Sequence, residues 1–304
     1  MESIRRACFL CLLLLLTNVS QKAQVKTLKL DELKDKISKE FSGVKGNFAL
    51  AFKDMQDPGN TILINADETF HAASTMKTPV MVEVFRQAAM GKFSLDDSIQ
   101  VKNEFKSIVD GSSFSMAIDR DSGEGLYKFI NRKRTIRQLV FEMITVSSNL
   151  ATNILIELVK AENAQNTMLS LGAKNIRVLR GVEDIKAFDK GLNNTTTAKD
   201  LMIIFEQIAK GSVVSKEACR EMTDILLKQK FRDVIPQKLP RSVKVAHKTG
   251  SVDGIKHDSG FVILPDGRQY VLVILSKNLE DMERGTEVLS GVSKIVYDYY
   301  VNQK

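Results

Sequence analysis

The spacing of apolar residues predicts a helix and a pair of strands at the start of the fold. Residues Leu30–Phe41 carry apolar side chains four positions apart, as an amphipathic helix does. Two apolar runs typical of strands follow, Asn47–Phe52 and Thr61–Asn65, and a turn sequence at residues 57–60 separates them. The first elements are therefore a helix and a hairpin.

A helical block occupies the middle of the chain. From Ser74 to about Gln229 the spacing of apolar residues is almost wholly helical. The helical segments within it are Thr75–Met90, Ile136–Val146, Leu150–Lys160, Ala198–Lys210 and Lys216–Gln229. Strand-like runs then return at Val243–Thr249, Ser259–Leu264 and Tyr270–Leu275. A final amphipathic helix is predicted over Met282–Tyr300.

This order of elements predicts an α/β (α+β) fold with two lobes. The strands at the two ends of the chain bury their faces only by pairing with one another. Hairpin connections imply a mainly antiparallel sheet flanked by the terminal helices. We expect a sheet lobe over about residues 25–73 and 241–304, and a helical lobe over about 74–240. A cleft between the two lobes is the natural place for a site.

The first residues are interpreted as a targeting segment. Two arginines precede an apolar run, Ala7–Leu16, which is too short to span a bilayer as a mature helix. The simplest interpretation is a secretory signal peptide over residues 1–24, cleaved near residue 23–24. It predicts a bacterial protein that is periplasmic or secreted, with one catalytic domain over 25–304 and no stable membrane insertion after processing.

Composition argues against several classes of function. The net charge of +7 is a mild basic excess spread along the chain, and solubility explains it without a nucleic-acid partner. After processing, Cys219 is the sole cysteine, so no intrachain disulfide is expected. Neither His247 nor His257 has a reason to lie beside it, which favours a buried apolar role. Three histidines without ligand spacing argue against a metal. We expect no cofactor and a monomer.

The first motif is Ser74-Thr75-Met76-Lys77, which places a hydroxyl and an amine on one helix face. A serine becomes a nucleophile when a neighbouring base takes its proton, and a lysine serves if burial and nearby positive charge lower its pKa. A free N–H at a helix start also suits an oxyanion. Ser42-Gly43-Val44-Lys45 has the same spacing in a predicted turn, so this motif alone indicates little.

Two further motifs follow it along the chain. Ser147-Ser148-Asn149 lies at the junction of two helical segments, where it is either a helix cap or a hydroxyl and an amide that face a cleft. Lys248-Thr249-Gly250-Ser251 ends an apolar strand, and its glycine allows a ligand close to the backbone. Each has an ordinary structural explanation by itself. Their order, S-x-x-K, S-x-N and K-T-G, points to function.

With these motifs, and with Thr195-Thr196-Thr197 opening a helix, the chain resembles the class A β-lactamases and their penicillin-binding relatives over nearly its whole length. The resemblance implies a five-stranded antiparallel sheet with helices beside an all-helical lobe. It also implies a hydrolase of β-lactams, associated with antibiotic resistance.

The resemblance assigns a role to each motif residue. It implies that Ser74 is acylated, that Lys77 is its proton partner, and that Ser147 shuttles a proton to the β-lactam nitrogen. Asn149 would bind the substrate side-chain amide. The substrate-binding residues implied for the carboxylate are Lys248 and Thr249, and the amides of Ser74 and Ser251 would form the oxyanion hole.

The chain departs from the family pattern at two places. Ser148 stands where the family has an aspartate that is mainly structural. The family also carries E-x-x-L-N before Thr195, with a glutamate that activates the water for hydrolysis of the acyl-enzyme. Glu183 is favoured as this base by spacing, whereas Asp189 precedes a Leu-Asn pair but lies close to Thr195. For either acid the alternative is a loop charge or a salt bridge to Arg180.

Deacylation therefore divides the functional hypotheses. If an acid on this loop positions water, the protein hydrolyses β-lactams. If none does, it is a slow-deacylating penicillin-binding or D-alanyl-D-alanine-peptidase-like enzyme that acts on a peptidoglycan-like substrate, or a β-lactam sensor. The sensor is disfavoured because the sequence predicts neither a transmembrane helix nor an output domain. A hydrolase of another amide or ester stays open, because the substituted loop and the segment Ser107–Gly125 could reshape the pocket.

Overall fold

A computed structural model describes residues 29–303 of the chain. The predicted signal peptide lies outside the described residues. Among the residues that are described, none of the helices combines the length and the apolar composition needed to cross a membrane.

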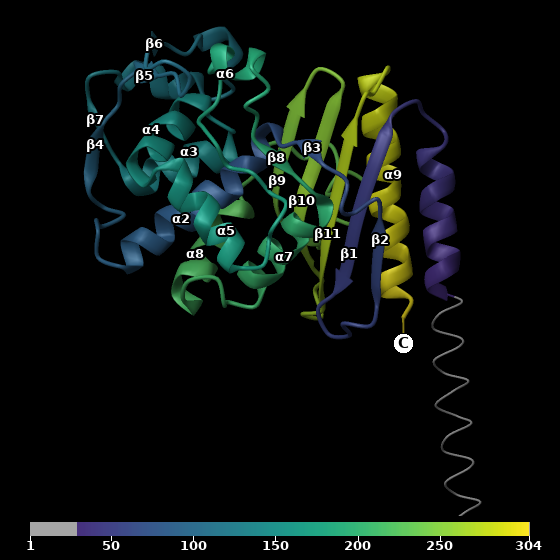
Figure 1. Ribbon diagram of the computed structural model, residues 1–304. Helices are drawn as coiled ribbons and strands as arrows, with labels where there is room; N and C mark the ends of the chain where they lie inside the picture. Colours follow the sequence, from purple (N-terminus) through teal and green to yellow (C-terminus); the bar gives the residue numbers. More distant parts are fainter. Residues whose placement is uncertain (1–28, 304) are drawn as a thin grey trace, which may run out of the picture.

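A five-stranded antiparallel sheet forms the centre of the molecule (Figure 1). Its strands lie in the order β2-β1-β11-β10-β9. Their bounds are β1 Asn47–Asp54, β2 Thr61–Ile64, β9 Lys244–Val252, β10 Ile255–Ile263 and β11 Gln269–Lys277. The strands from the two ends of the chain meet where β1 pairs with β11. The expected fold class and the pairing of the two chain ends are thus confirmed.

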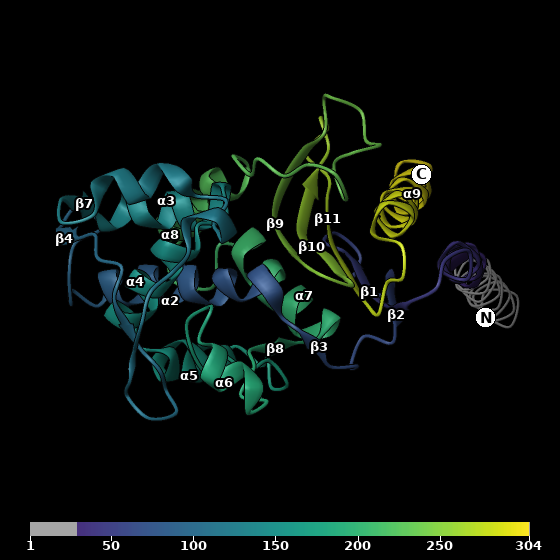
Figure 2. The same cartoon turned by 90° about the horizontal axis from the view of Figure 1, so that it is seen from above.

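The two faces of the sheet bury two different hydrophobic cores. One face packs against a helix over residues 29–41 and against α9 (Met282–Val301), which lie side by side in Figure 2. The other face packs against the helical lobe, and its core continues from Ala49 and Val273 of the sheet to Met76 and Leu139. Alternate side chains of each strand therefore serve opposite cores.

The helical lobe contains the helices that the spacing of apolar residues predicted. Their bounds are α2 Lys77–Ala89, α3 Ile136–Thr145, α4 Asn149–Val159, α7 Ala198–Ala209 and α8 Lys216–Leu226. Two further helices complete the lobe, α5 Ala161–Ser170 and α6 Ile185–Asp189. Capping fixes several starts: Thr135 forms a capping box at α3, and Thr197 caps α7.

The expectation that residues 74–229 are almost wholly helical is wrong for the stretch between α2 and α3. This stretch contains the short strands β4 Ser98–Gln100, β5 Phe105–Lys106, β6 Ser113–Phe114 and β7 Lys133–Thr135, with 3-10 turns η2 Ile118–Arg120 and η3 Glu124–Phe129. A further small pair joins β3 Phe70–His71 to β8 Thr195–Thr196. Strands of two or three residues are too short to show a period of apolar residues, so their formation depends on the strand with which they pair.

Candidate active site

Ser74 lies at the boundary between the two lobes. It belongs to the 3-10 turn η1 (Ala73–Met76), which continues directly into α2. Ala73, the residue before it, has a left-handed φ of 44°, a conformation that costs energy for a residue with a Cβ. Backbone strain of this kind persists only where the surrounding structure imposes it. The fold therefore fixes the orientation of Ser74 at the start of η1.

The edge strand β9 comes very close to Ser74. A Cβ added to Gly250 would lie 3.2 Å from the backbone nitrogens of both Ser74 and Thr75. Because β9 is the last strand of the sheet, alternate N–H groups on its open edge face away from β10. Ser251 follows Gly250 on this edge. The glycine thus lets the open edge of β9 lie close to the Ser74 amide.

Lys77 is fully buried beneath the nucleophile candidate. Its Nζ donates to the Ser147 carbonyl oxygen at 2.7 Å, to Ser147 Oγ at 3.1 Å and to Asn149 Oδ1 at 2.8 Å. The i, i+3 spacing from Ser74 places both residues on one side of the η1–α2 segment. Lys77 therefore joins the first motif, to which it belongs, to the second motif.

Burial has a larger influence on the pKa of Lys77 than any neighbouring charge. Loss of hydration lowers the pKa of Lys77 from 10.5 to about 7, against the opposing influence of Asp121 and Glu183. A second buried lysine, Lys248, shares the Ser147 hydroxyl with Lys77. The pKa of Lys248 is lowered by its own burial and then by Lys77.

The third motif contacts the second through the hydroxyl of Ser147. Lys248 is fully buried, and its Nζ donates to Ser147 Oγ at 3.0 Å and to the Thr249 carbonyl oxygen at 2.8 Å. Ser147 Oγ therefore accepts from two lysines, one from each lobe. A hydroxyl that accepts two such bonds has its own proton free to donate into the cleft.

The second motif serves as a cap and also faces the cleft. Ser148 caps α4 by accepting from the Ala151 N–H, as its ordinary structural interpretation predicted. Ser147 has a left-handed φ of 58°, so the chain reverses direction between α3 and α4. This reversal turns Ser147 and Asn149 toward Lys77 while Ser148 stays buried.

Glu183 faces the same cavity from the loop before α6. Asn149 Nδ2 donates to Glu183 Oε1 at 2.8 Å, so one amide side chain joins Lys77 to the loop acid. Burial raises the pKa of Glu183, while the bond from Asn149 lowers it and Asp121 raises it further. Glu183 itself has a left-handed φ of 60°. A half-buried carboxylate of raised pKa is suited to general-base chemistry.

Asp189 lies elsewhere. It ends α6 with an exposed side chain, whereas its neighbour Phe188 contributes to the cavity wall. The expected alternative, a salt bridge from either acid to Arg180, is not what this guanidinium does. It donates instead to the carbonyl oxygens of Leu192 and Gly181 and to Asn193 Oδ1. Arg180 thus binds other residues of its own loop, and the side chain of Glu183 binds Asn149 instead.

The cavity in front of Ser74 has a volume of about 700 Å³. Its lining includes the polar or charged residues Ser74, Asn149, Glu183 and Ser251. It also includes the apolar residues Ile185, Phe188, Val252 and Ile255. A smaller adjoining cavity reaches Ser147 and Thr249. The cavity therefore suits a ligand with a polar reacting centre and an apolar side group.

Two residues of the site were missed from the sequence. Asn153, one helical turn after Asn149, accepts from the Val182 N–H at 2.7 Å and donates to the Val182 carbonyl oxygen at 3.0 Å, which anchors the loop next to Glu183. Asp121 is buried against the start of α4. The four-residue spacing of the two asparagines was a usable signal for Asn153. A single aspartate in a loop gives none.

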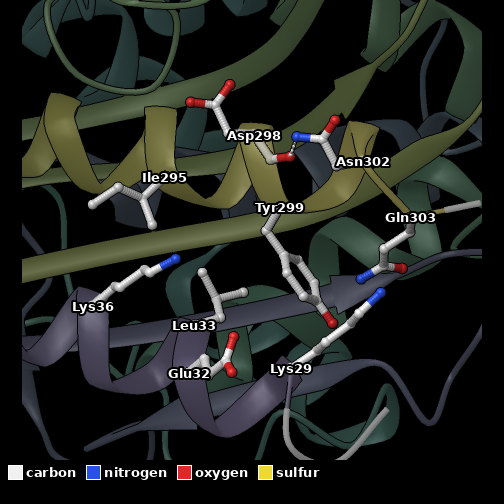
Figure 3. Close-up of a pocket in the computed structure, with 9 residues that line it drawn as sticks. All are labelled: Lys29, Glu32, Leu33, Lys36, Ile295, Asp298, Tyr299, Asn302 and Gln303. Atoms are coloured by element: carbon white, nitrogen blue, oxygen red, sulfur yellow. Dashed lines mark hydrogen bonds between the residues drawn. The ribbon is translucent and has the colours of Figure 1, made fainter. Parts of the chain in front are cut away.

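A second cavity lies on the far side of the sheet, between the helix over 29–41 and α9 (Figure 3). It is lined by Lys29, Glu32, Leu33 and Lys36 on one side and by Ile295, Asp298 and Tyr299 of α9 on the other, and the Tyr299 hydroxyl donates to Asn60 Oδ1. It is a surface groove between two helices and lacks the paired lysine and serine chemistry found around Ser74.

The remaining titratable groups do not form a second reactive centre in residues 29–303. Within this range no three His, Cys, Asp or Glu side chains are grouped as metal ligands. Cys219 is buried in α8. His247 Nδ1 lies 2.8 Å from Asp258 Oδ1, and both side chains are fully buried beneath β9 and β10. This pair belongs to the sheet core.

Comparison with known proteins gives one consistent result. The model of a family described as "Beta-lactamase enzyme family" matches residues 32–300. A β-lactamase of Bacteroides uniformis is 25% identical over 96% of this chain and 99% of its own length. The crystal structure of the TLA-1 extended-spectrum β-lactamase has a TM-score of 0.77 at 23% identity, covering 90% of this chain and 99% of its own. The structure of PBP-A has a TM-score of 0.76 at 24% identity, covering 90% and 97%.

Proposed function

The chain belongs to the beta-lactamase enzyme family, and from this premise we propose that it is a class A-like serine β-lactamase whose acyl-enzyme forms on Ser74. The observation that carries the proposal is the convergence at Ser147 and Asn149. Lys77 and Lys248 both donate to Ser147 Oγ, and Asn149 joins Lys77 to Glu183. Groups for acylation and for hydrolysis therefore meet in one cavity.

In the acylation step, Ser74 Oγ attacks the β-lactam carbonyl carbon while Lys77 accepts the hydroxyl proton. A pKa of about 7 leaves a large neutral fraction of Lys77 at neutral pH, so its amine has a lone pair available. The Ser74 and Ser251 amides stabilise the oxyanion. The ring C–N bond then breaks, Ser147 gives its proton to the leaving nitrogen, and Lys77 passes the proton taken from Ser74 on to Ser147 Oγ.

Substrate binding falls to the remaining motif residues. Asn149 binds the side-chain amide of the substrate beside Glu183. Lys248 and Thr249 bind its carboxylate, and this anion raises the proton affinity that burial and Lys77 have lowered in Lys248. The negative charge of the substrate thus stabilises the protonated form of a buried lysine.

In the deacylation step, Glu183 takes a proton from a water molecule that attacks the ester carbonyl carbon. The Ser74–acyl bond breaks, and the proton returns to Ser74 Oγ. Support for this role comes from the position of Glu183 in the cavity wall and from its contact with Asn149. Asp189 has an exposed side chain outside that wall.

The second candidate is a slow-deacylating penicillin-binding or D-alanyl-D-alanine-peptidase-like enzyme. The observation in its favour is the loop, where Lys186 and Ala187 stand in place of the family's Leu-Asn pair. Ala187 is buried against the Asp184 cap and offers no amide side chain to a water. The fold itself does not separate the two candidates, since PBP-A shares it.

One experiment separates these functions. Purified mature protein is mixed with a chromogenic cephalosporin, and hydrolysis is followed together with the intact mass. We expect many turnovers per molecule. A stable one-to-one adduct would replace the β-lactamase with the slow-deacylating enzyme or with a sensor. Absence of both hydrolysis and adduct would favour another ester or amide as substrate.

We also propose the finer points of export and assembly. The signal peptide is cleaved near residue 23–24, and the mature protein is a periplasmic or secreted monomer whose partner is a small β-lactam. The mass of the protein recovered from a bacterial periplasm gives the cleavage site. Light scattering coupled to gel filtration gives the assembly state, and a particle of twice the chain mass would contradict the monomer.

A further inference from the structure

An aspartate outside the three motifs is buried against the second of them. Asp121 follows η2, and its carboxylate lies at the first turn of α4. Its Oδ1 accepts from the Asn149 N–H at 2.9 Å, and its Oδ2 accepts from the Leu150 N–H at 2.8 Å. These two N–H groups have no partner within the helix, and a carboxylate there also complements the helix dipole.

Three more donors complete the environment of this carboxylate. The Gly123 N–H donates to Oδ1 at 2.8 Å, the Tyr127 hydroxyl to Oδ2 at 3.2 Å and the Ser148 hydroxyl to Oδ2 at 3.3 Å. Both oxygens are thus occupied, and each bond is made to an ionised acceptor in a buried place. Such bonds are about twice as strong as neutral ones.

The backbone around Asp121 is fitted to a small residue at position 148. A Cβ on Gly123 would lie 2.3 Å from Ser148 Cβ, so the segment that carries Asp121 lies directly on Ser148. Ser148 is the position where the resemblance implies an aspartate. In this chain the carboxylate against the turn therefore comes from Asp121 on the covering segment and not from position 148.

We propose that Asp121 is a positioning residue for the proposed reaction, holding the Ser147–Asn149 turn from the segment outside it. The inference rests on the proposed function, because Ser147 and Asn149 are the groups it orients. Asp121 binds the backbone of Asn149, while the side chain of Asn149 binds Lys77 and Glu183. A shift of the turn thus moves the contacts of both proton-transfer groups.

The charge of Asp121 also acts on its surroundings. It raises the pKa of Lys77 and contributes to the raised pKa of Glu183, of Tyr127 and of Glu142 on α3. Arg120 and Asp119 lie on the adjoining turn η2. Loss of this one negative charge is therefore expected to lower the pKa of Lys77, an effect that a purely structural role would not produce.

The first test compares Asp121→Asn with Asp119→Asn. The asparagine keeps one acceptor oxygen but places an NH2 group opposite the Leu150 N–H. Two donors then face each other, so the Ser147–Asn149 turn has to shift. We expect acylation of Asp121→Asn to slow by about 10- to 100-fold, as misplaced catalytic groups do. Asp119 is exposed two residues away, so its variant removes the same charge and should acylate at the wild-type rate.

The second test introduces the acid at position 148. Ser148→Asp brings a second carboxylate against Asp121 under the Gly123 backbone, and like charges this close disfavour each other. We expect Ser148→Asp to slow acylation less in the Asp121→Asn background than in the wild type, because only the wild type holds both charges. Equal effects in the two backgrounds would overturn the inference, since independent sites are additive.

The third test does not depend on turnover. The pKa of Lys77 is measured from the pH dependence of its ¹³Cε NMR signal, assigned with Lys77→Ala. We expect a lower value in Asp121→Asn than in wild type and in Asp119→Asn. An unchanged value, or wild-type acylation by folded Asp121→Asn, would overturn the inference. Wild-type protein that never reacts with a β-lactam would instead defeat the proposed function, and the titration would still decide the influence of Asp121.

Discussion

Lys77 determines how acylation depends on pH. Because burial lowers its pKa to about 7, the amine is mostly protonated below this value and mostly neutral above it. Only the neutral amine accepts the Ser74 proton. We therefore predict that the acylation rate rises with pH along a single limb centred at about 7, when it is measured by stopped flow with enzyme in excess over a chromogenic cephalosporin.

The same measurement separates Lys77 from a carboxylate base. A limb shifted to lower pH, toward but above the ordinary pKa of glutamate of about 4 to 5, would assign the first proton transfer to Glu183, because burial raises the pKa of this carboxyl. A rate independent of pH across the neutral range would exclude both groups as titrating bases. Circular dichroism at each pH serves as the control that the protein stays folded.

Glu183 and Asp189 are expected to differ sharply on substitution. Glu183→Gln keeps the contact with Asn149 but cannot take a proton from water, so we predict a fall in deacylation of about 10²- to 10⁴-fold. The acyl-enzyme then accumulates and is seen by intact mass. Asp189→Asn, the matched change on the exposed end of α6, should keep wild-type turnover. The opposite pattern would move the base to Asp189.

At the scale of single residues, the sequence predicted the groups that belong to ordered motifs. Lys77 donates to the side chains of Ser147 and Asn149, and Lys248 donates to Ser147, so residues of the three motifs lie together. Asp121 and the closing role of Arg180 were beyond such reasoning. Several of their partners are main-chain groups of residues distant along the chain, such as Leu192 for Arg180 and Asn149 for Asp121. Any sequence supplies a backbone N–H or C=O at every position except the N–H of proline.

At the scale of elements, the contact between β9 and η1 is what brings the lobes' catalytic groups together. Gly250→Ala would place a methyl group 3.2 Å from the Ser74 and Thr75 nitrogens. These are backbone atoms, so the strand has to move away. We predict a loss of about 1–3 kcal/mol in stability and slower acylation, because the Ser74 and Ser251 amides separate.

A second glycine provides the control for that prediction. An added Cβ on Gly125, in η3, meets no atom within 4 Å. Gly125→Ala should therefore leave the thermal midpoint and the acylation rate near wild type. An equal loss in both variants would mean that the cost comes from the backbone freedom of glycine and not from the contact with η1.

Regular elements were predictable where an apolar period persists over several turns or strand residues. The predicted segment Ile136–Val146 differs by one residue from α3, and Met282–Tyr300 by one from α9. The structure of the segment between α2 and α3 was not predicted in this way. Its strands β4 and β7 pair although more than thirty residues separate them, with Ser98 opposite Thr135. A local pattern of apolar residues does not indicate so distant a partner.

At the scale of the whole molecule, the division into lobes does not divide the hydrophobic core. Ala49 and Val273 of the sheet share one cluster with Met76, Leu139 and other residues of the helical lobe. The lobes also share the hydrogen bond from Lys248 to Ser147 across the cleft. Neither lobe buries its apolar face alone, so the two should be stable only together.

We therefore predict that the lobes unfold in one cooperative transition. The chain has no tryptophan, and four of its tyrosines, Tyr270, Tyr297, Tyr299 and Tyr300, lie in β11 or α9. Tyrosine fluorescence thus reports mainly on the sheet lobe, whereas circular dichroism in the far ultraviolet reports mainly on the helical lobe. The two signals should give the same midpoint in urea, as a two-state transition requires. Separate midpoints would show that the sheet lobe and the helical lobe are independent folding units.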